Sequence, residues 1–266
     1  MASVIDIAAA RRVLEVVDKG LITGKGRPCP GHMCVEAAVC YALGEPHSDR
    51  PSCVGQAVRM FKIQLNDSAW CGAQSRAAGL RDLAVAQLGS LDVDQIEFAQ
   101  FVTLESVRQI LPIALRLLEM EQQAVACETV ADVPAASKTL LTILAEVDDD
   151  RSEGRTVSRA VARMIEATTF ALQAGECRST GELPQAEAKA ELAASYVALA
   201  AEVVAQANAR VNFLPASNAG DDARLAVMRH AAKIGMDALR HVECPGVALL
   251  DSIKAELARG ESEPSG

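Results

Sequence analysis

The chain has 266 residues, of which 50% are apolar and only 3% aromatic, and its formal net charge is −9. This length and apolar content provide for a substantial buried core and argue against a largely disordered chain. Alanine, leucine and valine supply most of the apolar residues. Such side chains pack closely between helices, so the composition favours an all-α fold over a sheet sandwich.

Charge and cysteine are distributed unevenly. Residues 1–90 carry 10 Lys/Arg against 8 Asp/Glu, a net +2, whereas residues 91–266 carry 16 against 27, a net −11. Five of the eight cysteines lie in the first 71 residues. We therefore expect a Cys/His/Gly-rich helical region over 1–90 and an acidic, Ala-rich helical bundle over 91–266, with a further internal boundary at the acidic stretch 148–154.

No export or membrane signal is evident. Residues 1–12 lack a basic segment followed by an apolar run and a small-residue cleavage site. Charge-free runs such as 192–201 stop at about ten residues, whereas a membrane span needs roughly 20. We expect a cytoplasmic protein without a membrane partner, whose thiols are reduced.

The first region is expected to alternate helices with Gly/Pro-rich loops. Segment 24–31 contains three glycines and two prolines, which favour a loop. The helix that follows is apolar nearly all round except for Glu36, so this helix should be buried with its carboxylate in the interior. Apolar spacing predicts the helices of this region at 4–17, 33–43, 54–66 and 73–88.

Long helices are expected throughout the second region. Asp92 with Gln95 resembles a capping box, and Thr103 is expected to be the N-cap of a helix over 104–123 that is kinked at Pro112. The remaining helices are expected at 137–147, with Ser137 as N-cap, and at 156–174, 185–210, 221–242 and 247–259. Because no strand pattern occurs, we expect an all-α multi-helix bundle or irregular helical array of about nine helices, without significant sheet.

A metal centre is the first candidate site. Thiolate and imidazole are the ligands that zinc prefers, so zinc is the one cofactor that the sequence suggests. Three of the candidate ligands fall within one loop and helix start, but the other two are spaced more widely than the ligand pairs of structural zinc sites. The alternative is a set of buried thiols and a capping histidine. The candidate ligands are Cys29, His32, Cys34, His47 and Cys53.

Cys34 is also a candidate nucleophile. A thiol in the first turn of a helix has its thiolate stabilised by the positive end of the helix dipole, and His32 or His47 could activate it. From Cys34 to Gly44 the sequence resembles the nucleophile-bearing helix of papain-like cysteine peptidases, which implies a reactive cysteine at this position. The upstream glutamine of that family has no counterpart, because the first glutamine of this chain is Gln56.

Glu36 is the second candidate catalytic residue. A carboxylate on an otherwise apolar helix should have a raised pKa, and such groups are enriched at functional sites. Structural pairing with Arg27, Arg50 or Arg59 would explain a buried Glu36 equally well.

A small anion is a further candidate ligand of the glycine-rich loop. Glycine amides, two cations and a helix start all favour a phosphate or carboxylate. The pattern is no P-loop, because Lys25 is not followed by Ser or Thr and no strand precedes the glycines. The alternative is a solvated connector. The residues concerned are Gly24, Lys25, Gly26, Arg27 and Gly31.

A basic face across two helices could contact nucleic acid. Its members compete with Asp67 and Asp82, and the whole chain is acidic with a pI near 5.0, which disfavours a nucleic-acid partner. The alternative is an ordinary solvated face. The five residues are Arg50, Arg59, Lys62, Arg76 and Arg81.

The sequence contains no complete catalytic signature. We therefore expect a non-enzymatic cytoplasmic protein that acts through protein–protein contact, self-assembly or recognition of a small anion, using the surface around residues 20–71. An enzyme that uses Cys34 or a Cys/His metal site is the alternative, and local nucleic-acid contact is a second alternative.

Overall fold

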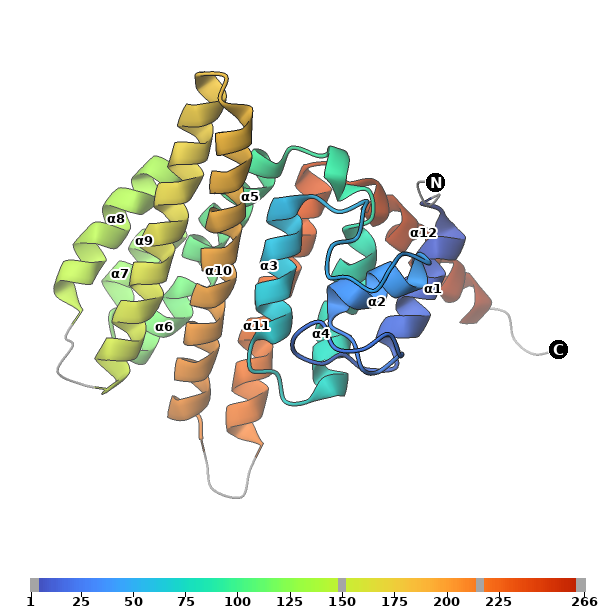
Figure 1. The fold of residues 1–266 in the computed structure, drawn as a ribbon. Coiled ribbons are helices and arrows are strands. Elements are labelled where there is room, and N and C mark those ends of the chain that lie inside the picture. The colour runs from blue at the N-terminus through green and yellow to red at the C-terminus, as the bar shows by residue number, and fades with distance from the viewer. Residues whose placement is uncertain (1–4, 148–151, 214–217, 262–266) are drawn as a thin grey trace.

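The chain folds into helices joined by loops (Figure 1). The computed structural model describes residues 5–147, 152–213 and 218–261, and in these ranges the only β-type pairing is an isolated bridge between Gly26 and Met33. The prediction of an all-α fold is therefore confirmed. The helices in this part of the chain are α1 (Ile7–Val17), α2 (Val35–Ala42), α3 (Gln56–Asp67), α4 (Ala73–Ala86), the short 3₁₀ helix η1 (Ser90–Asp92), α5 (Gln95–Gln109), α6 (Leu111–Leu117), α7 (Glu121–Glu128), α8 (Val133–Glu146), α9 (Ser152–Ser179), α10 (Leu183–Val211), α11 (Ala219–His241) and α12 (Pro245–Glu261).

The predicted helix over 104–123 is wrong. Asp94 starts α5 about ten residues earlier, because its carboxylate accepts hydrogen bonds from the backbone N–H groups of Ile96 and Glu97. Thr103 is therefore no N-cap but lies buried inside α5, where its hydroxyl donates to the carbonyl of Ala99 at 2.7 Å. Pro112 separates α5 from α6 rather than kinking one helix.

Two other predicted helix ends also differ. Asp132 rather than Ser137 caps α8, since the carboxylate of Asp132 accepts from Ala135 N. The helix expected to end at Gly175 continues to Ser179 as α9. Residues 148–151 of the predicted boundary at 148–154 lie outside the described residues, and α9 begins at Ser152.

α10 is the central helix. Figure 1 shows α6, α7 and α8 gathered beyond α9, and α1, α2, α4 and α12 on the opposite side of the molecule. Between these groups α10 packs against α3, α5, α9 and α11. Its buried residues are almost all alanine and valine, and such small side chains let neighbouring helices approach closely. Helices of the two predicted regions thus share one hydrophobic core, while the division at residue 90 stays a prediction.

By length and composition, α10 could cross a membrane, and no other helix in the described residues could. The sequence predicted no such span, because the charge-free runs are short. In the structure, 61% of the most apolar window of α10 is buried against other helices, which is also the pattern of a core helix in a soluble protein.

Glycine lets α11 approach the core closely. The ring of Phe61 lies against Gly235, and it also packs edge-on against Phe98 with ring centroids 6.0 Å apart. A methyl group at Gly235 would lie 2.5 Å from the Phe61 ring. Phe61 is fully buried and has no room to move away.

We therefore expect Gly235→Ala to lower the free energy of unfolding by about 1–3 kcal/mol, because it overpacks the core. Gly175→Ala in α9 is the matched control, since its methyl group would meet only the flexible end of Gln100. The control should raise stability by up to about 1 kcal/mol through helix propensity. Urea denaturation measures both variants, and equal effects would contradict the packing argument.

Candidate functional site

Two buried side chains, Asn66 and Arg76, hold the loop between α1 and α2. The guanidinium of Arg76 donates to the carbonyls of Asn66 (2.6 Å) and Leu21 (2.9 Å). The Asn66 amide donates to the carbonyl of Ile22 at 2.9 Å, and its oxygen accepts from the backbone N–H of Val35 at 3.1 Å. The loop that the sequence marked as chemically distinctive is therefore anchored at both ends.

The predicted anion-binding residues do not converge on a shared pocket. The backbone N–H of Gly24 already donates to the carboxylate of Asp67 at 2.8 Å, so the chain supplies its own anion there. Gly26 lets the backbone pass close to His32, because a Cβ at this position would lie 2.1 Å from the carbonyl of His32. α2 begins at Val35 rather than near Gly31, and its first N–H groups donate to Asn66 and Cys34. The side chains of Lys25 and Arg27 are exposed.

The five candidate metal ligands are not brought together. Cys34 turns its sulfur to the start of α2, His47 contacts the carbonyl of Gly26 through Nε2 at 3.0 Å, and Cys29 is exposed on the loop. His32 is also exposed, and Cys53 is half-buried near the start of α3. Across the described ranges, no three His, Cys, Asp or Glu side chains lie close enough to share a metal ion.

Burial outweighs the helix dipole at Cys34. This residue is the N-cap of α2, and its sulfur accepts a hydrogen bond from Ala37 N at 3.4 Å, which favours the thiolate. The side chain is, however, only 4% exposed, and burial raises the pKa of the Cys34 thiol to about 11. The sequence predicted a stabilised thiolate at Cys34, whereas burial in the structure raises the pKa of this thiol and disfavours its thiolate.

We expect alkylation of the native protein to distinguish Cys34 from Cys29. At pH 7 a pKa of about 11 leaves roughly one Cys34 in ten thousand as thiolate, and the sulfur is shielded as well. Iodoacetamide should therefore label exposed Cys29 and spare Cys34, as quantified by peptide mass spectrometry. Cys34 labelling at the rate of Cys29 would instead support a nucleophile.

Glu36, Lys62 and Gln87 form a buried polar cluster between α2, α3 and the end of α4. All three side chains are fully buried, which confirms the expectation that Glu36 lies in the interior. Lys62 Nζ lies 3.4 Å from Glu36 Oε1, and Gln87 Nε2 donates to Glu36 Oε2 at 3.0 Å. Burial raises the pKa of Glu36 and lowers the pKa of Lys62, since each loses the hydration of its charge.

The predicted basic face does not exist as a surface. Lys62, Arg59 and Arg76 are buried, because α3 is covered by α10 and α2 and the guanidinium of Arg76 is turned into the loop scaffold. Arg81 pairs with Asp18 at 2.7 Å, and Arg50 alone of the five is largely exposed. The expected partners of Glu36 were arginines, whereas the structure supplies Lys62.

Asn66→Ala should loosen the loop from α1 to α2. The substitution leaves the carbonyl of Ile22 and the N–H of Val35 without their partner, so we expect a loss of about 2–3 kcal/mol in the free energy of unfolding. Hydrogen exchange should accelerate over residues 20–35 and stay unchanged in α9. Gln74→Ala is the control, because its exposed amide makes only a 3.4 Å contact with Lys19; an equal loss there would contradict the scaffold.

An open groove of about 660 Å³ is lined by residues of α5, α8, α9 and the end of α11. Its lining is mainly apolar, and most of its charged lining residues are acidic. The apolar lining residues are Phe101, Leu104, Val133, Pro134 and Leu172. The charged or titratable lining residues are Glu97, Glu105, Asp132, Glu176, Arg108 and His241. We call this feature the acidic groove.

Internal contacts fix the two basic side chains of the acidic groove. His241 stacks on Phe101 with ring centroids 4.8 Å apart and lies 2.9 Å from a carboxylate oxygen of Glu97. Arg108 donates to Glu105 at 2.6 Å and to the carbonyl of Val130 at 2.7 Å. The carboxylates therefore outnumber the cations, and the groove favours a positively charged ligand.

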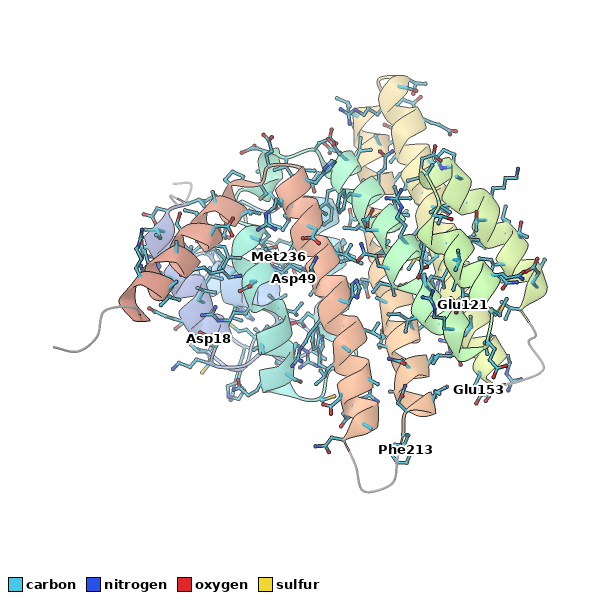
Figure 2. All side chains as sticks on the ribbon, turned by 180° about the vertical axis from the view of Figure 1, so that it is seen from behind. Asp18, Asp49, Glu121, Glu153, Phe213 and Met236 are labelled. Carbon is cyan, nitrogen blue, oxygen red and sulfur yellow. The ribbon has the colours of Figure 1, made fainter. Side chains whose placement is uncertain are left out.

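A smaller cavity of about 350 Å³ lies between α4, α11 and α12. Met236 of α11, labelled in Figure 2, lines this cavity together with residues of α4 and α12. Its lysines are engaged by neighbouring carboxylates, with Lys233 at 2.6 Å from Asp237 and Lys254 at 2.5 Å from Asp82. These ion pairs leave little charge with which to select a ligand.

The sequence did not reveal the acidic groove. Its lining residues come from four segments that are far apart in the chain, and no motif links Glu97 or Leu104 to Leu172 or His241. The only signal was the excess of acidic residues after position 90. Comparisons with protein-family models, with curated proteins and with solved structures gave no match.

Proposed function

We propose that this protein is a non-enzymatic, cytoplasmic interaction protein whose acidic groove binds a cationic, amphipathic helical segment of a partner protein. The observation that carries the proposal is one groove whose lining combines apolar side chains such as Phe101 and Leu172 with the carboxylates of Glu97, Glu105 and Glu176. The proposal keeps the expected class of function but moves the docking surface away from residues 20–71.

Helix-in-groove recognition explains this combination of surfaces. An amphipathic helix buries its apolar face in the groove, and its basic residues then lie beside the acidic rim. Complementary charge speeds the encounter and fixes the orientation of the helix.

The charge of the whole second region favours the same class of partner. With a net charge of −11 over residues 91–266, this part of the chain repels nucleic acid and anionic membranes. A basic protein segment is attracted rather than repelled by this negative charge. The enzyme alternative has less support, since burial holds the pKa of Cys34 near 11.

The test uses a labelled synthetic helix with leucine on one face and lysine on the other. We expect this peptide to bind the full chain, and to bind less tightly as salt rises, because the attraction is partly electrostatic. Glu176→Lys should weaken binding roughly tenfold, equivalent to about 1.4 kcal/mol, because it places a cation at the rim. Fluorescence anisotropy measures the affinities.

Two controls separate the acidic groove from net charge. Glu15→Lys makes the same charge change at an exposed position on α1, outside the groove, and should leave the affinity within about twofold. A peptide with glutamate in place of lysine should not bind. Equal losses in Glu176→Lys and Glu15→Lys would show that binding is non-specific and would remove the proposal.

A further inference from the structure

The acidic groove runs lengthwise along α5. The lining residues that α5 contributes begin with Glu97 and end with Arg108, and their spacing of three or four residues places them on one face of the helix. At 1.5 Å per residue, the distance along the axis from Glu97 to Arg108 is about 16 Å, or roughly three turns. The groove is therefore long enough for about three turns of a bound helix, and it has two distinct ends.

The first end lies where α5 begins, beside the C-termini of α9 and α11. His241, the last residue of α11, lies 2.9 Å from a carboxylate oxygen of Glu97. Arg178, in the last turn of α9, pairs with Asp94, the N-cap of α5. Glu176 belongs to the same turn of α9 and lines the groove. A helix C-terminus carries a partial negative charge, so two such termini add to the carboxylates here. We call this the α9–α11 end.

The second end lies where α5 finishes, beside the N-terminus of α8. Arg108 donates to the carbonyls of Val130 at 2.7 Å and Ala131 at 3.0 Å, two residues that directly precede the N-cap of α8. A helix N-terminus carries a partial positive charge. We call this the α8 end, and its guanidinium and helix N-terminus distinguish it from the α9–α11 end.

The carboxylates at the two ends differ in their existing partners. At the α8 end, both oxygens of Glu105 already accept hydrogen bonds, one of them from Arg108 at 2.6 Å. The carboxylate of Asp132 caps the first turn of α8. At the α9–α11 end, the side chain of Glu176 is exposed and forms no ion pair with any residue in the part of the chain that the structure describes. The negative charge open to a ligand is therefore concentrated at the α9–α11 end.

We propose that the acidic groove binds its partner helix parallel to α5, with the N-terminus and most of the basic residues of that helix at the α9–α11 end. This inference rests on the proposed function and adds the direction of the bound helix and the position of its charge. In this orientation the positive N-terminus of the ligand meets Glu176 and the C-termini of α9 and α11. Its negative C-terminus meets Arg108 and the start of α8. The reverse orientation brings like charges together at both ends.

The partner class that fits is an amphipathic segment of about three turns whose basic residues lie in its first half. The test compares two peptides of identical composition, both acetylated and amidated, with leucine on one face. One peptide carries its lysines in the first half and the other carries them in the second half. We expect the first peptide to bind the full chain roughly fivefold more tightly, as measured by fluorescence anisotropy.

Neither net charge nor peptide helicity can produce this preference. The two peptides have the same charge, and lysines near the N-terminus disfavour a free helix, so helicity alone favours the second peptide. Glu176→Gln should reduce the preference to about twofold, because it removes a carboxylate from the α9–α11 end. Glu15→Gln makes the same change at an exposed position on α1, outside the groove, and should leave the preference unchanged.

Photo-cross-linking reads the direction of the bound helix directly. A benzophenone at the N-terminus of the first peptide should become attached to tryptic fragment 179–189 or 241–254, which contain Ser179 and His241 of the α9–α11 end. A benzophenone at its C-terminus should instead become attached to fragment 117–138, which contains Asp132 of the α8 end. The reverse pattern overturns the inference.

The outcomes separate this inference from the proposed function. If neither peptide binds, the proposed function fails and the inference fails with it. If both bind with equal affinity, or the second binds more tightly, the groove still binds a cationic helix but the assigned direction is wrong. A preference that survives in Glu176→Gln to the wild-type extent removes the part assigned to the α9–α11 end.

Discussion

Burial of α3 on more than one side is the constraint from which the other features follow. α2 covers one side of this helix, and α10, α5 and α11 cover the others, so side chains that would normally face water lie inside the protein. Lys62 then needs a partner, and α2 provides Glu36. Removing two charges from water is costly, and burial accordingly raises the pKa of Glu36 and lowers the pKa of Lys62.

The same packing separates two kinds of polar chemistry. Inside the protein, Glu36, Lys62 and Asn66 act on neighbouring groups of the chain itself, because water cannot reach them. At the surface, the carboxylates of the acidic groove face solvent, and Glu97 and Glu105 also contact His241 and Arg108. The groove and the cluster lie on different helices, so substitutions in the groove leave the contacts of the cluster in place.

Apolar periodicity predicted most of the helices. It predicted burial less well, because the spacing within one helix does not show which neighbouring helices cover it. Glu36 was correctly expected inside, because its helix is apolar all round. Lys62 was expected at the surface, because the side of α3 that carries it also carries Arg59 and Asn66. Only tertiary contacts reveal that this side is covered. The N-cap at Asp94 was missed because it depends on a local hydrogen bond that leaves no distinctive spacing. The lining of the acidic groove was missed because it comes from helices that are distant in the chain.

The position of α10 in the chain has a consequence during synthesis. α10 follows α3 only after α4 to α9 have been made, so a nascent chain holds α3 with its outer side uncovered for much of translation. Contacts between such distant segments form slowly, and the exposed surface can associate with other chains. Until α10 docks, Arg59 of α3 lacks Glu191, the partner that α10 brings to within 3.8 Å. The pairing of Arg59 with Glu191 would then mark the moment at which the late helix docks on the early one.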